Sequence, residues 1–265
     1  MYMKENLQDI KLFIFDLDGT IYIGNREIEG SFDAVRKLKE MGKKICFFTN
    51  NSSRSYKEYI KKFADMGLEI TEDEIYTSGQ ATCEWLLENH PKKKVFLLGN
   101  PSIQAEFKTY GIELDEDNPD ICVVAFDTSL EYSRVYKFCN KLFNNRDMLY
   151  VATHPDKSCP APECPMPDIG AIISLIYDTI QRQPDVIIGK PFETAGEIIR
   201  KRFGVGSKEV AMVGDRLSTD IGFGNRCGFS TILVLSGETS MEDVKKSKVK
   251  AKYILQDVKE ILGNV

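Results

Sequence analysis

Histidine is scarce in this sequence, since only His90 and His154 occur among its 265 residues. Sites with several histidine ligands, and most catalytic pairs of serine or cysteine with histidine, therefore have too few imidazole rings to draw on. No cysteine is followed by an arginine six positions later, so the phosphate-binding loop of cysteine-based phosphatases is absent as well. Any chemistry must rely on carboxylates, lysine and hydroxyl groups.

Long apolar runs and an excess of positive charge are also lacking. The net charge is -5, which gives no basic footprint for nucleic acid or an anionic membrane. No apolar run approaches the length of a membrane span, and the first residues lack the core of a signal peptide. The seven cysteines are odd in number and lie mostly in apolar segments, which fits reduced thiols better than disulfides. We expect a cytoplasmic protein that binds neither nucleic acid nor a membrane.

Short apolar strands alternate with amphipathic stretches in the two ends of the chain. The predicted strands are "LFIF" (12–15), "KICFFT" (44–49), "VIIG" (186–189), "VAMVG" (210–214) and "TILVL" (231–235). Stretches such as "SFDAVRKLKEMG" (31–42) follow them and close on glycine, as helices commonly do. This order predicts an α/β fold with a doubly wound, parallel, Rossmann-like sheet.

The middle of the chain carries a second α/β pattern. Strands are predicted at 93–99, 120–126 and 148–153, with a helix at 129–145. We interpret this as a smaller α/β domain inserted into the first. The predicted domains are a core in two parts, residues 1–80 and 184–265, and an inserted domain of residues 81–183. Residues 154–168 form a proline-rich loop within the insertion.

Polar residues follow each buried strand of the predicted core. They are Asp16 and Asp18, Thr49 and Asn50, Lys190, and Asp215 and Asp220. Ligands of open parallel sheets bind beyond the carboxyl ends of the strands, so these side chains are expected at one edge. Carboxylate oxygens suit Mg²⁺, and lysine and hydroxyl donors stabilise phosphoryl oxygens. The set predicts a magnesium-dependent phosphoryl-transfer site.

The stretch "LFIFDLDGTIY" (12–22) gives that site a mechanism. A carboxylate can attack phosphorus and form an aspartyl-phosphate, and we assign this role to Asp16. Two residues further on, Asp18 is placed to protonate the leaving oxygen and then deprotonate water. Gly19 lets the chain turn so that both carboxylates reach one phosphorus atom.

Four motifs in this order resemble those of the haloacid dehalogenase (HAD) superfamily: "DLDGT", "TNNSSRS", "IGKP" and "GDRLSTDI". The likeness covers nearly the whole chain and includes "VLSGETS" (234–240). The spacing from Asp16 to Thr49 is too short for a cap domain there, whereas that from Thr49 to Lys190 matches the C2-capped branch (subfamily IIA) of p-nitrophenyl phosphatase-like, sugar-phosphate and nucleotide phosphatases. The resemblance thus implies a HAD core with an inserted C2 cap.

The resemblance also implies roles for individual residues. Asp16, the Asp18 carbonyl and Asp215 look like the Mg²⁺ ligands, and Asp220 looks like a supporting acid behind them. Thr49 and Asn50 are expected to hold phosphate oxygens, and Lys190 to neutralise the charges of Asp16 and the phosphate. The implied partner is a small phosphorylated metabolite, and the cap is a candidate surface for a homodimer.

Departures from the family pattern lie in the inserted domain. The usual "TNPD" appears as Thr153-His154-Pro155-Asp156, and a glycine-rich segment appears as residues 167–170. We expect His154, Asp156 and Asp168 to contact the organic part of the substrate. A second hypothesis, metal binding by His154, Cys159 and Cys164, is disfavoured because no paired CxxC and no fourth ligand are evident.

Other activities on the same core were weighed against hydrolysis. A phosphomutase or phosphotransferase keeps the D-x-D pair, although its usual cap follows the first motif. A phospho-receiver signalling module also places acids, threonine and lysine on a doubly wound sheet. However, such a module has adjacent acids at its first strand, and it contains no insertion of this length. Phosphomonoester hydrolysis is the favoured interpretation.

Overall fold

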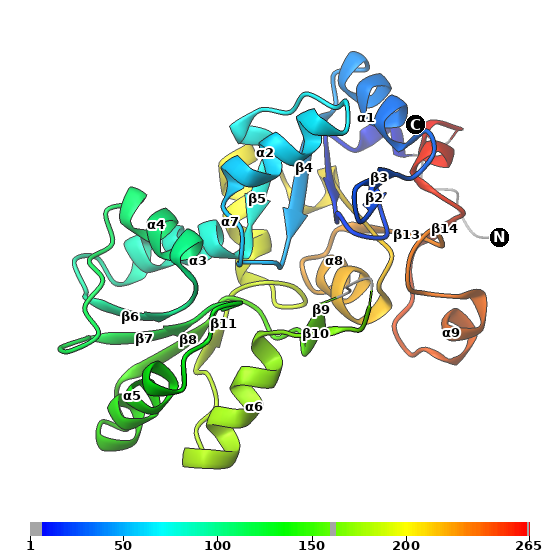
Figure 1. Cartoon of the computed structure of the whole chain (residues 1–265). Coiled ribbons are helices and arrows are strands. Elements are labelled where there is room, and N and C mark those ends of the chain that lie inside the picture. The colour runs from blue at the N-terminus through cyan, green and yellow to red at the C-terminus, as the bar shows by residue number, and fades with distance from the viewer. Residues whose placement is uncertain (1–6, 160–162, 264) are drawn as a thin grey trace. The chain divides into compact units, whose positions relative to one another are not determined.

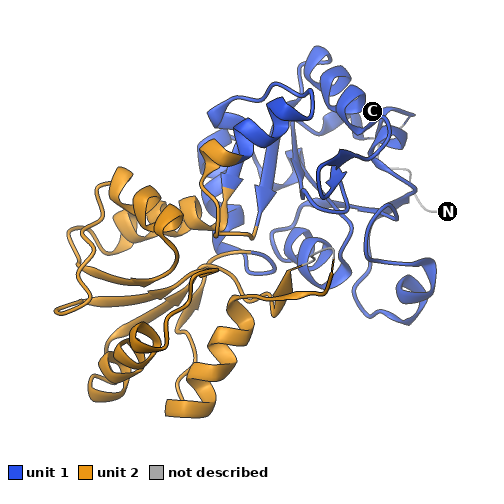
Figure 2. Cartoon of the chain, viewed as in Figure 1, with its two compact units in different colours: residues 1–49, 59–76, 190–265 blue, residues 50–58, 77–189 orange. Residues whose placement is uncertain are grey.

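The computed structural model describes residues 7–159, 163–263 and 265 of the chain. These residues divide into two compact units (Figure 2). The first, called the core unit, comprises residues 1–49, 59–76 and 190–265. The second, called the inserted unit, comprises residues 50–58 and 77–189. The predicted insertion, 81–183, falls within the second unit, which also includes residues 50–58, 77–80 and 184–189 from the predicted core. The strand predicted for the core at 186–189 is therefore corrected, because Val186–Ile187 pairs in parallel with a strand of the inserted unit.

A six-stranded sheet organises the core unit, with strand order β14-β13-β12-β1-β4-β5 (Figure 1). The strands are β1 (Leu12–Phe15), β4 (Lys44–Thr49), β5 (Ile75–Thr77), β12 (Val210–Gly214), β13 (Ser230–Val234) and β14 (Tyr253–Leu255). β1 pairs in parallel with both β4 and β12, and all four of its side chains are buried. The continuous apolar run therefore marks a strand covered on both faces, as predicted.

Helices and short turns connect these strands. They are α1 (Ser31–Glu40), α2 (Tyr56–Asp65), α7 (Thr194–Phe203), α8 (Gly222–Arg226) and α9 (Met241–Lys246), together with the hairpin of β2 (Tyr22–Ile23) and β3 (Arg26–Glu27). Short 3₁₀ segments cover Leu7–Asp9, Glu72–Glu74, Ser207–Glu209 and Val258–Gly263, and a π-helical turn covers Leu217–Ile221. α9 begins with a capping box in which the Ser240 hydroxyl accepts from the amide of Asp243.

The inserted unit has its own parallel sheet, of order β11-β8-β7-β6. Its strands are β6 (Val95–Leu98), β7 (Ile121–Val124), β8 (Leu149–Ala152) and β11 (Val186–Ile187), and β9 (Ser158–Cys159) pairs with β10 (Met166–Pro167) as a separate hairpin. The helices are α3 (Ser78–Asn89), α4 (Pro101–Thr109), α5 (Tyr132–Asn144) and α6 (Ile169–Ile180).

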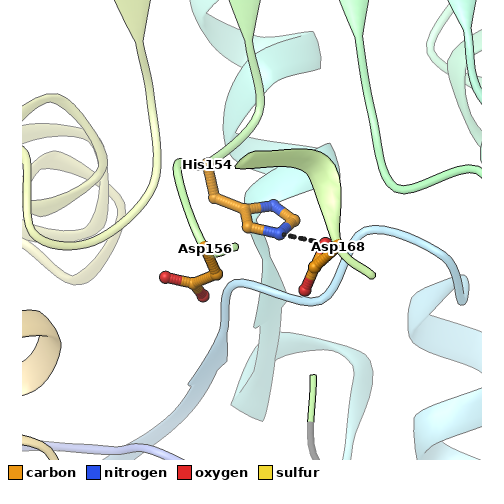
Figure 3. A group of neighbouring side chains, drawn as sticks. All are labelled: His154, Asp156 and Asp168. Carbon is orange, nitrogen blue, oxygen red and sulfur yellow. Dashed lines mark hydrogen bonds and ion pairs between the residues drawn. The ribbon is translucent and has the colours of Figure 1, made fainter. Parts of the chain in front are cut away.

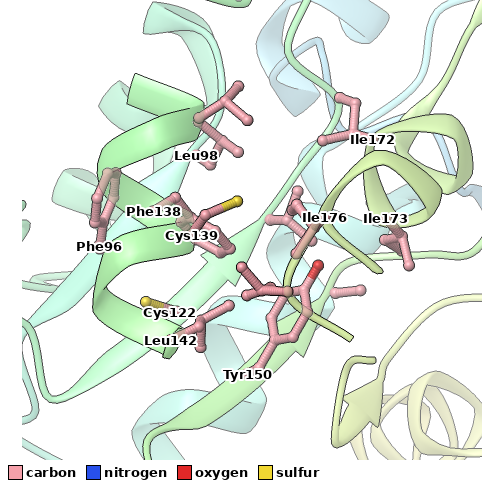
Figure 4. Packing of buried hydrophobic residues seen from close by; sticks show 14 of the residues in the cluster. Phe96, Leu98, Cys122, Phe138, Cys139, Leu142, Tyr150, Ile172, Ile173 and Ile176 are labelled. Atoms are coloured by element: carbon pink, nitrogen blue, oxygen red, sulfur yellow. The ribbon is translucent and has the colours of Figure 1, made fainter. Parts of the chain in front are cut away.

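A separate hydrophobic core lies inside the inserted unit. Phe138 and Leu142 of α5 and Ile176 of α6 pack with Phe96 and Tyr150 of the sheet (Figure 4). Because this cluster closes without residues of the core unit, the insertion is a domain with a core of its own. The doubly wound α/β fold with an inserted α/β unit is thus confirmed.

No helix within the described residues is both long enough and apolar enough to cross a membrane.

Candidate active site

The ends of β1 and its two neighbours place the predicted acids at one edge of the core sheet. Phe15, the last residue of β1, lies beside Phe47 of β4 and Val213 of β12. Asp16 follows, and its amide donates to the Val213 carbonyl at 2.9 Å. Because all three strands are parallel, the residues after each of them emerge on the same side of the sheet.

Lys190 lies at the centre of the acidic group. Its Nζ is 2.5 Å from Asp16 Oδ1 and 2.8 Å from Asp220 Oδ1, and it donates to the Phe48 carbonyl at 3.1 Å. The lysine side chain is 1% exposed. A lysine buried to this degree needs paired carboxylates, so the fold requires this ion pair whatever its chemical role.

The charges of this group perturb one another strongly. Burial alone would lower the pKa of Lys190, but the carboxylates of Asp16 and Asp220 outweigh it and raise that pKa. Burial raises the pKa of Asp16 well above its ordinary value; Lys190 opposes this shift, and the charges of Asp220 and Asp215 add to it. Burial followed by the charge of Asp220 raises the pKa of Asp215 to about 6. Three acids and one lysine leave an excess of negative charge that a proton or a cation must balance.

Asp215 has one oxygen held by the fold and one without a partner. Oδ2 accepts from the amide of Glu238 at 2.7 Å, whereas Oδ1 is buried and has no hydrogen-bond partner among the described residues. Two glycines make room for this carboxylate. A Cβ on Gly19 would lie 2.5 Å from Oδ2, and one on Gly237 only 2.1 Å from it.

The group fits a divalent cation. One oxygen each from Asp16, Asp215 and Asp220 lies within 4.8 Å of the others. Oxygen-only ligands suit a hard cation, and a cation there would satisfy the open Oδ1 of Asp215 and offset the excess negative charge.

The remaining residues of the first two motifs are placed as follows. The Asp18 side chain is exposed, while its backbone forms a bridge with Tyr22. Gly19 has a φ of 84°, a left-handed conformation that favours glycine, and the turn there is tied down by the Ser236 hydroxyl, which donates to the Gly19 carbonyl at 2.7 Å. Thr49 is buried at the end of β4.

The sequence analysis assigned no role to three residues that lie around the site. Ser236, Gly237 and Glu238 shape the turn and hold Asp215. They lie in "VLSGETS", which the family resemblance covered without indicating what its residues do. The signal available in the sequence was the glycine directly before a polar pair, which is compatible with any surface turn.

The three residues predicted to contact substrate gather in the inserted unit (Figure 3). His154 Nε2 lies 3.0 Å from Asp168 Oδ1, and both side chains are buried. On the other side of the ring, Nδ1 lies 3.2 Å from the Thr153 hydroxyl and 3.4 Å from that of Ser78. Asp156 is partly exposed and accepts from Asn50 Nδ2 at 3.0 Å. These contacts engage both ring nitrogens of His154 within the fold.

The structure separates the cysteines of this loop from the histidine. The group that could ligate a metal there consists of His154, Asp156 and Asp168, and neither Cys159 nor Cys164 belongs to it. Cys164 is exposed, and Cys159 accepts a weak hydrogen bond from Asn51 Nδ2 at 3.9 Å. Since each of the three grouped side chains already has a partner, we describe the group as a hydrogen-bond network.

Comparison with known proteins identifies the family. A model described as haloacid dehalogenase-like hydrolase matches residues 13–113, and a second HAD-hydrolase-like model matches residues 187–261. Phosphoglycolate phosphatase 1A of Arabidopsis thaliana is 31% identical, over 97% of this chain and 78% of its own length. The chain belongs to the haloacid dehalogenase-like hydrolases. The predicted superfamily and its hydrolase class are confirmed.

Two further relatives place the chain within that family. The 5'-nucleotidase YutF of Bacillus subtilis is 30% identical and covers 96% of this chain and 98% of its own. The crystal structure of a 4-nitrophenylphosphatase from Thermotoga maritima superposes with a TM-score of 0.94 at 40% identity, covering 97% of this chain and 98% of that one. These relatives, a nucleotidase and a nitrophenylphosphatase, belong to the branch of HAD enzymes that the sequence analysis expected, and that branch is confirmed.

Proposed function

We propose that this chain is a Mg²⁺-dependent phosphomonoester hydrolase that acts on a small phosphorylated metabolite through a phosphoryl-aspartate on Asp16. The observation that carries the proposal is the buried contact of Lys190 with Asp16 and Asp220, beside the open oxygen of Asp215. An acid positioned by a buried lysine at a strand end is arranged to meet a phosphate group.

The chain's own residues account for two half-reactions. In the first, an Asp16 oxygen bonds to phosphorus while the bond to the ester oxygen breaks, and Asp18 gives that oxygen its proton. In the second, Asp18 takes a proton from water as the water oxygen attacks phosphorus, which frees inorganic phosphate and restores Asp16. The exposed side chain of Asp18 is accessible to the water that it deprotonates in the second half-reaction. Thr49, Asn50 and Lys190 are proposed to hold the phosphoryl oxygens.

Asp16, the backbone carbonyl of Asp18 and Asp215 are the proposed Mg²⁺ ligands. Asp220 is better suited to support them, because Oδ1 pairs with Lys190 and Oδ2 accepts from the amide of Arg216 at 3.0 Å. When bound, the cation would screen the charge between the acids and a phosphate dianion.

The names of the relatives support a substrate class for this proposal. Phosphatases named for phosphoglycolate, 5'-nucleotides and nitrophenyl phosphate cover nearly all of this chain in their alignments. We therefore propose a sugar phosphate, a nucleoside monophosphate or a phosphoglycolate-like ester, with selectivity supplied by the inserted unit as a C2 cap. The cytoplasmic location and a homodimer through the cap stay predictions.

A phosphate-release screen tests the proposal. The purified protein is assayed with phosphoglycolate, nucleoside monophosphates, sugar phosphates and 4-nitrophenyl phosphate, each with Mg²⁺ and with excess chelator. We expect turnover with Mg²⁺, none with chelator, and recovery when Mg²⁺ is added back. Asp16→Asn serves as the matched inactive variant. Turnover that persists in chelator, or that survives Asp16→Asn, would contradict the proposed mechanism.

A further inference from the structure

Three large aromatic side chains are exposed on α5 of the inserted unit (Figure 1). Tyr132 is 85% exposed, Tyr136 is 65% exposed and Phe143 is 54% exposed. Because spacings of four and seven residues return to the same side of an α-helix, the three rings share one flank of α5, and we call them the aromatic stripe. The core of the inserted unit is filled by other residues of this helix, among them Phe138 and Leu142. The packing of the domain therefore does not account for the stripe.

The charged side chains of α5 lie on its other flank. Arg134 pairs with Glu116 at 2.8 Å. Lys137 pairs with Asp117 at 2.8 Å, and Lys141 donates to the carbonyl of Asp117. The exposed neighbours of the stripe on α5 are instead neutral and polar: Ser133, Asn140 and Asn144. A neutral polar border suits a protein partner better than nucleic acid or an anionic membrane, both of which select for basic surfaces.

The exposed area of the stripe is close to what a dimer needs. An aromatic side chain offers roughly 150–250 Å² for burial, so the three exposed fractions amount to about 400 Å². A standard interface buries about 800 Å² on each partner, of which roughly 55–65% is apolar. The stripe would supply most of that apolar part, and its polar neighbours would supply the rim. Exposed apolar patches of this size often mark interaction sites.

The two ends of the stripe carry opposite charges. Glu131, which is exposed, directly precedes Tyr132 at one end. At the other end the guanidinium carbon of Arg146 lies 5.0 Å from the centre of the Phe143 ring, and Nη1 donates to the Ile180 carbonyl at 3.1 Å. If two α5 helices meet antiparallel about a two-fold axis, Tyr132 of each copy lies against Phe143 of the other. The same arrangement brings Glu131 of each copy to Arg146 of the other, whereas parallel helices would set like charges side by side.

We propose that the aromatic stripe of α5 binds a second copy of this chain and forms a two-fold dimer in which the two α5 helices are antiparallel. Within the stripe, Tyr136 lies nearest the midpoint between Tyr132 and Phe143, so it is closest to the axis and approaches its own counterpart. This arrangement gives the homodimer expected from the sequence a defined surface. It does not depend on the proposed phosphatase function, because no residue of the candidate active site takes part.

Sedimentation velocity of the purified full chain, over a wide range of micromolar concentrations, tests this surface. We expect a wild-type particle of twice the chain mass. Tyr136→Lys and Tyr136→Glu each bring two like charges together at the axis, and each should weaken dimerisation by at least about 100-fold. A mixture of the two variants pairs lysine with glutamate and should form a dimer that contains one copy of each. Leu87→Lys, at a leucine of α3 that is 40% exposed, is the matched control and should remain dimeric.

The charges at the ends of the stripe test the antiparallel orientation. At low salt, Glu131→Lys and Arg146→Glu should each weaken the dimer by about tenfold, because each sets like charges against one another at two symmetric places. The double variant exchanges the two charges and should recover wild-type affinity. Losses that add in the double variant would contradict the antiparallel arrangement.

Three outcomes would overturn the proposed dimer surface. They are a wild type that stays monomeric over the whole concentration range, a dimer that Tyr136→Lys and Tyr136→Glu leave intact, and a mixture of these variants that does not associate. The melting temperatures of all variants should match that of the wild type, because the substituted side chains are exposed, and this measurement separates loss of the dimer from loss of the fold. None of these results depends on phosphate release, so failure of the proposed function would be seen separately.

Discussion

Lys190 Nζ lies 2.8 Å from Asp220 Oδ1, and both side chains are 1% exposed. Either charge alone would be unfavourable in a protein interior, so the pairing stabilises both, and Lys190 Nζ also contacts Asp16 Oδ1 at 2.5 Å. Asp220 also accepts from the amide of Arg216, which fixes the turn after β12. One buried ion pair therefore joins the ends of three chain segments.

Replacing Lys190 tests how far stability and activity depend on this pair. Lys190→Met removes the cation and leaves two carboxylates buried, a change that typically costs about 3–5 kcal/mol. We expect a lower melting temperature, partly recovered by Mg²⁺, and a loss of at least about 100-fold in kcat/KM. Lys208→Met, at an exposed lysine, is the control. A Lys190→Met protein as stable and active as that control would contradict the role assigned to the pair.

Substitutions of the two aspartates of the first motif should block different steps of the reaction. Asp16→Asn should form no phosphoenzyme, measured by denaturing quench after mixing with labelled substrate. Asp18→Asn should lower kcat by about 10²–10⁴, the usual worth of general acid–base catalysis. Because 4-nitrophenyl phosphate has a good leaving group, its first step suffers less, and phosphoenzyme should accumulate in Asp18→Asn. The melting temperature of this variant should be unchanged, since the side chain is exposed. A loss of tenfold or less would remove Asp18 from the mechanism.

The positions of the acids at the strand ends could be predicted from the sequence, because strand ends follow simple rules. Continuous apolar runs marked β1, β4 and β12, and parallel pairing then places Asp16, Thr49 and Asp215 at one edge. Such reasoning needs only local pattern and topology. It missed the short strands β5 and β14, three residues each. Segments of that length carry too little periodicity to be distinguished from loops.

Contacts between distant segments were beyond the reach of the sequence. Nothing in "TNNSSRS" shows that Asn50 is held by Asp156, 106 positions further along the chain. Likewise, His154 and Asp168 are polar residues of a proline-rich loop, where exposure is the usual expectation. The structure instead buries both, because each satisfies the other's hydrogen-bonding groups. Their predicted contact with the substrate stays untested.

Gly237 should be required for metal affinity and not for the fold. A Cβ at this position would lie 2.1 Å from Asp215 Oδ2, so Gly237→Ala must displace the carboxylate. Disturbing a group that orients a ligand typically costs about 10–100-fold in metal affinity, and we expect that loss here. It is measured from the Mg²⁺ dependence of turnover and from the rise in melting temperature on adding Mg²⁺. Gly206→Ala is the matched control, since its nearest neighbour is Glu209 Oε2 at 3.4 Å. Equal Mg²⁺ dependence in both variants would show that Gly237 does not shape the site.

Glu106 should make the stability of the protein depend on pH. This side chain of α4 is 4% exposed, and Oε2 has no hydrogen-bond partner among the described residues. Burial raises its pKa to about 7; the amide of Tyr56, which donates to Oε1 at 3.2 Å, opposes the shift, and the charge of Glu58 adds to it. The folded state thus holds a proton that the unfolded state releases near its ordinary pKa of 4.5.

The sign of the dependence follows from that proton. Between about pH 4.5 and pH 7 the folded protein binds more protons at Glu106 than the unfolded chain does, so its contribution to stability falls as pH rises. The loss is complete above pH 7 and is on the order of 3 kcal/mol at most. The Glu106→Gln side chain is neutral at every pH, so this variant does not undergo that loss of stability. The free energy of unfolding of Glu106→Gln, relative to wild type, should therefore increase from pH 5 to pH 8. Glu163→Gln, at an exposed acid, is the control and should show no such trend. If the difference in free energy of unfolding between Glu106→Gln and wild type were constant from pH 5 to pH 8, Glu106 would not titrate in this range.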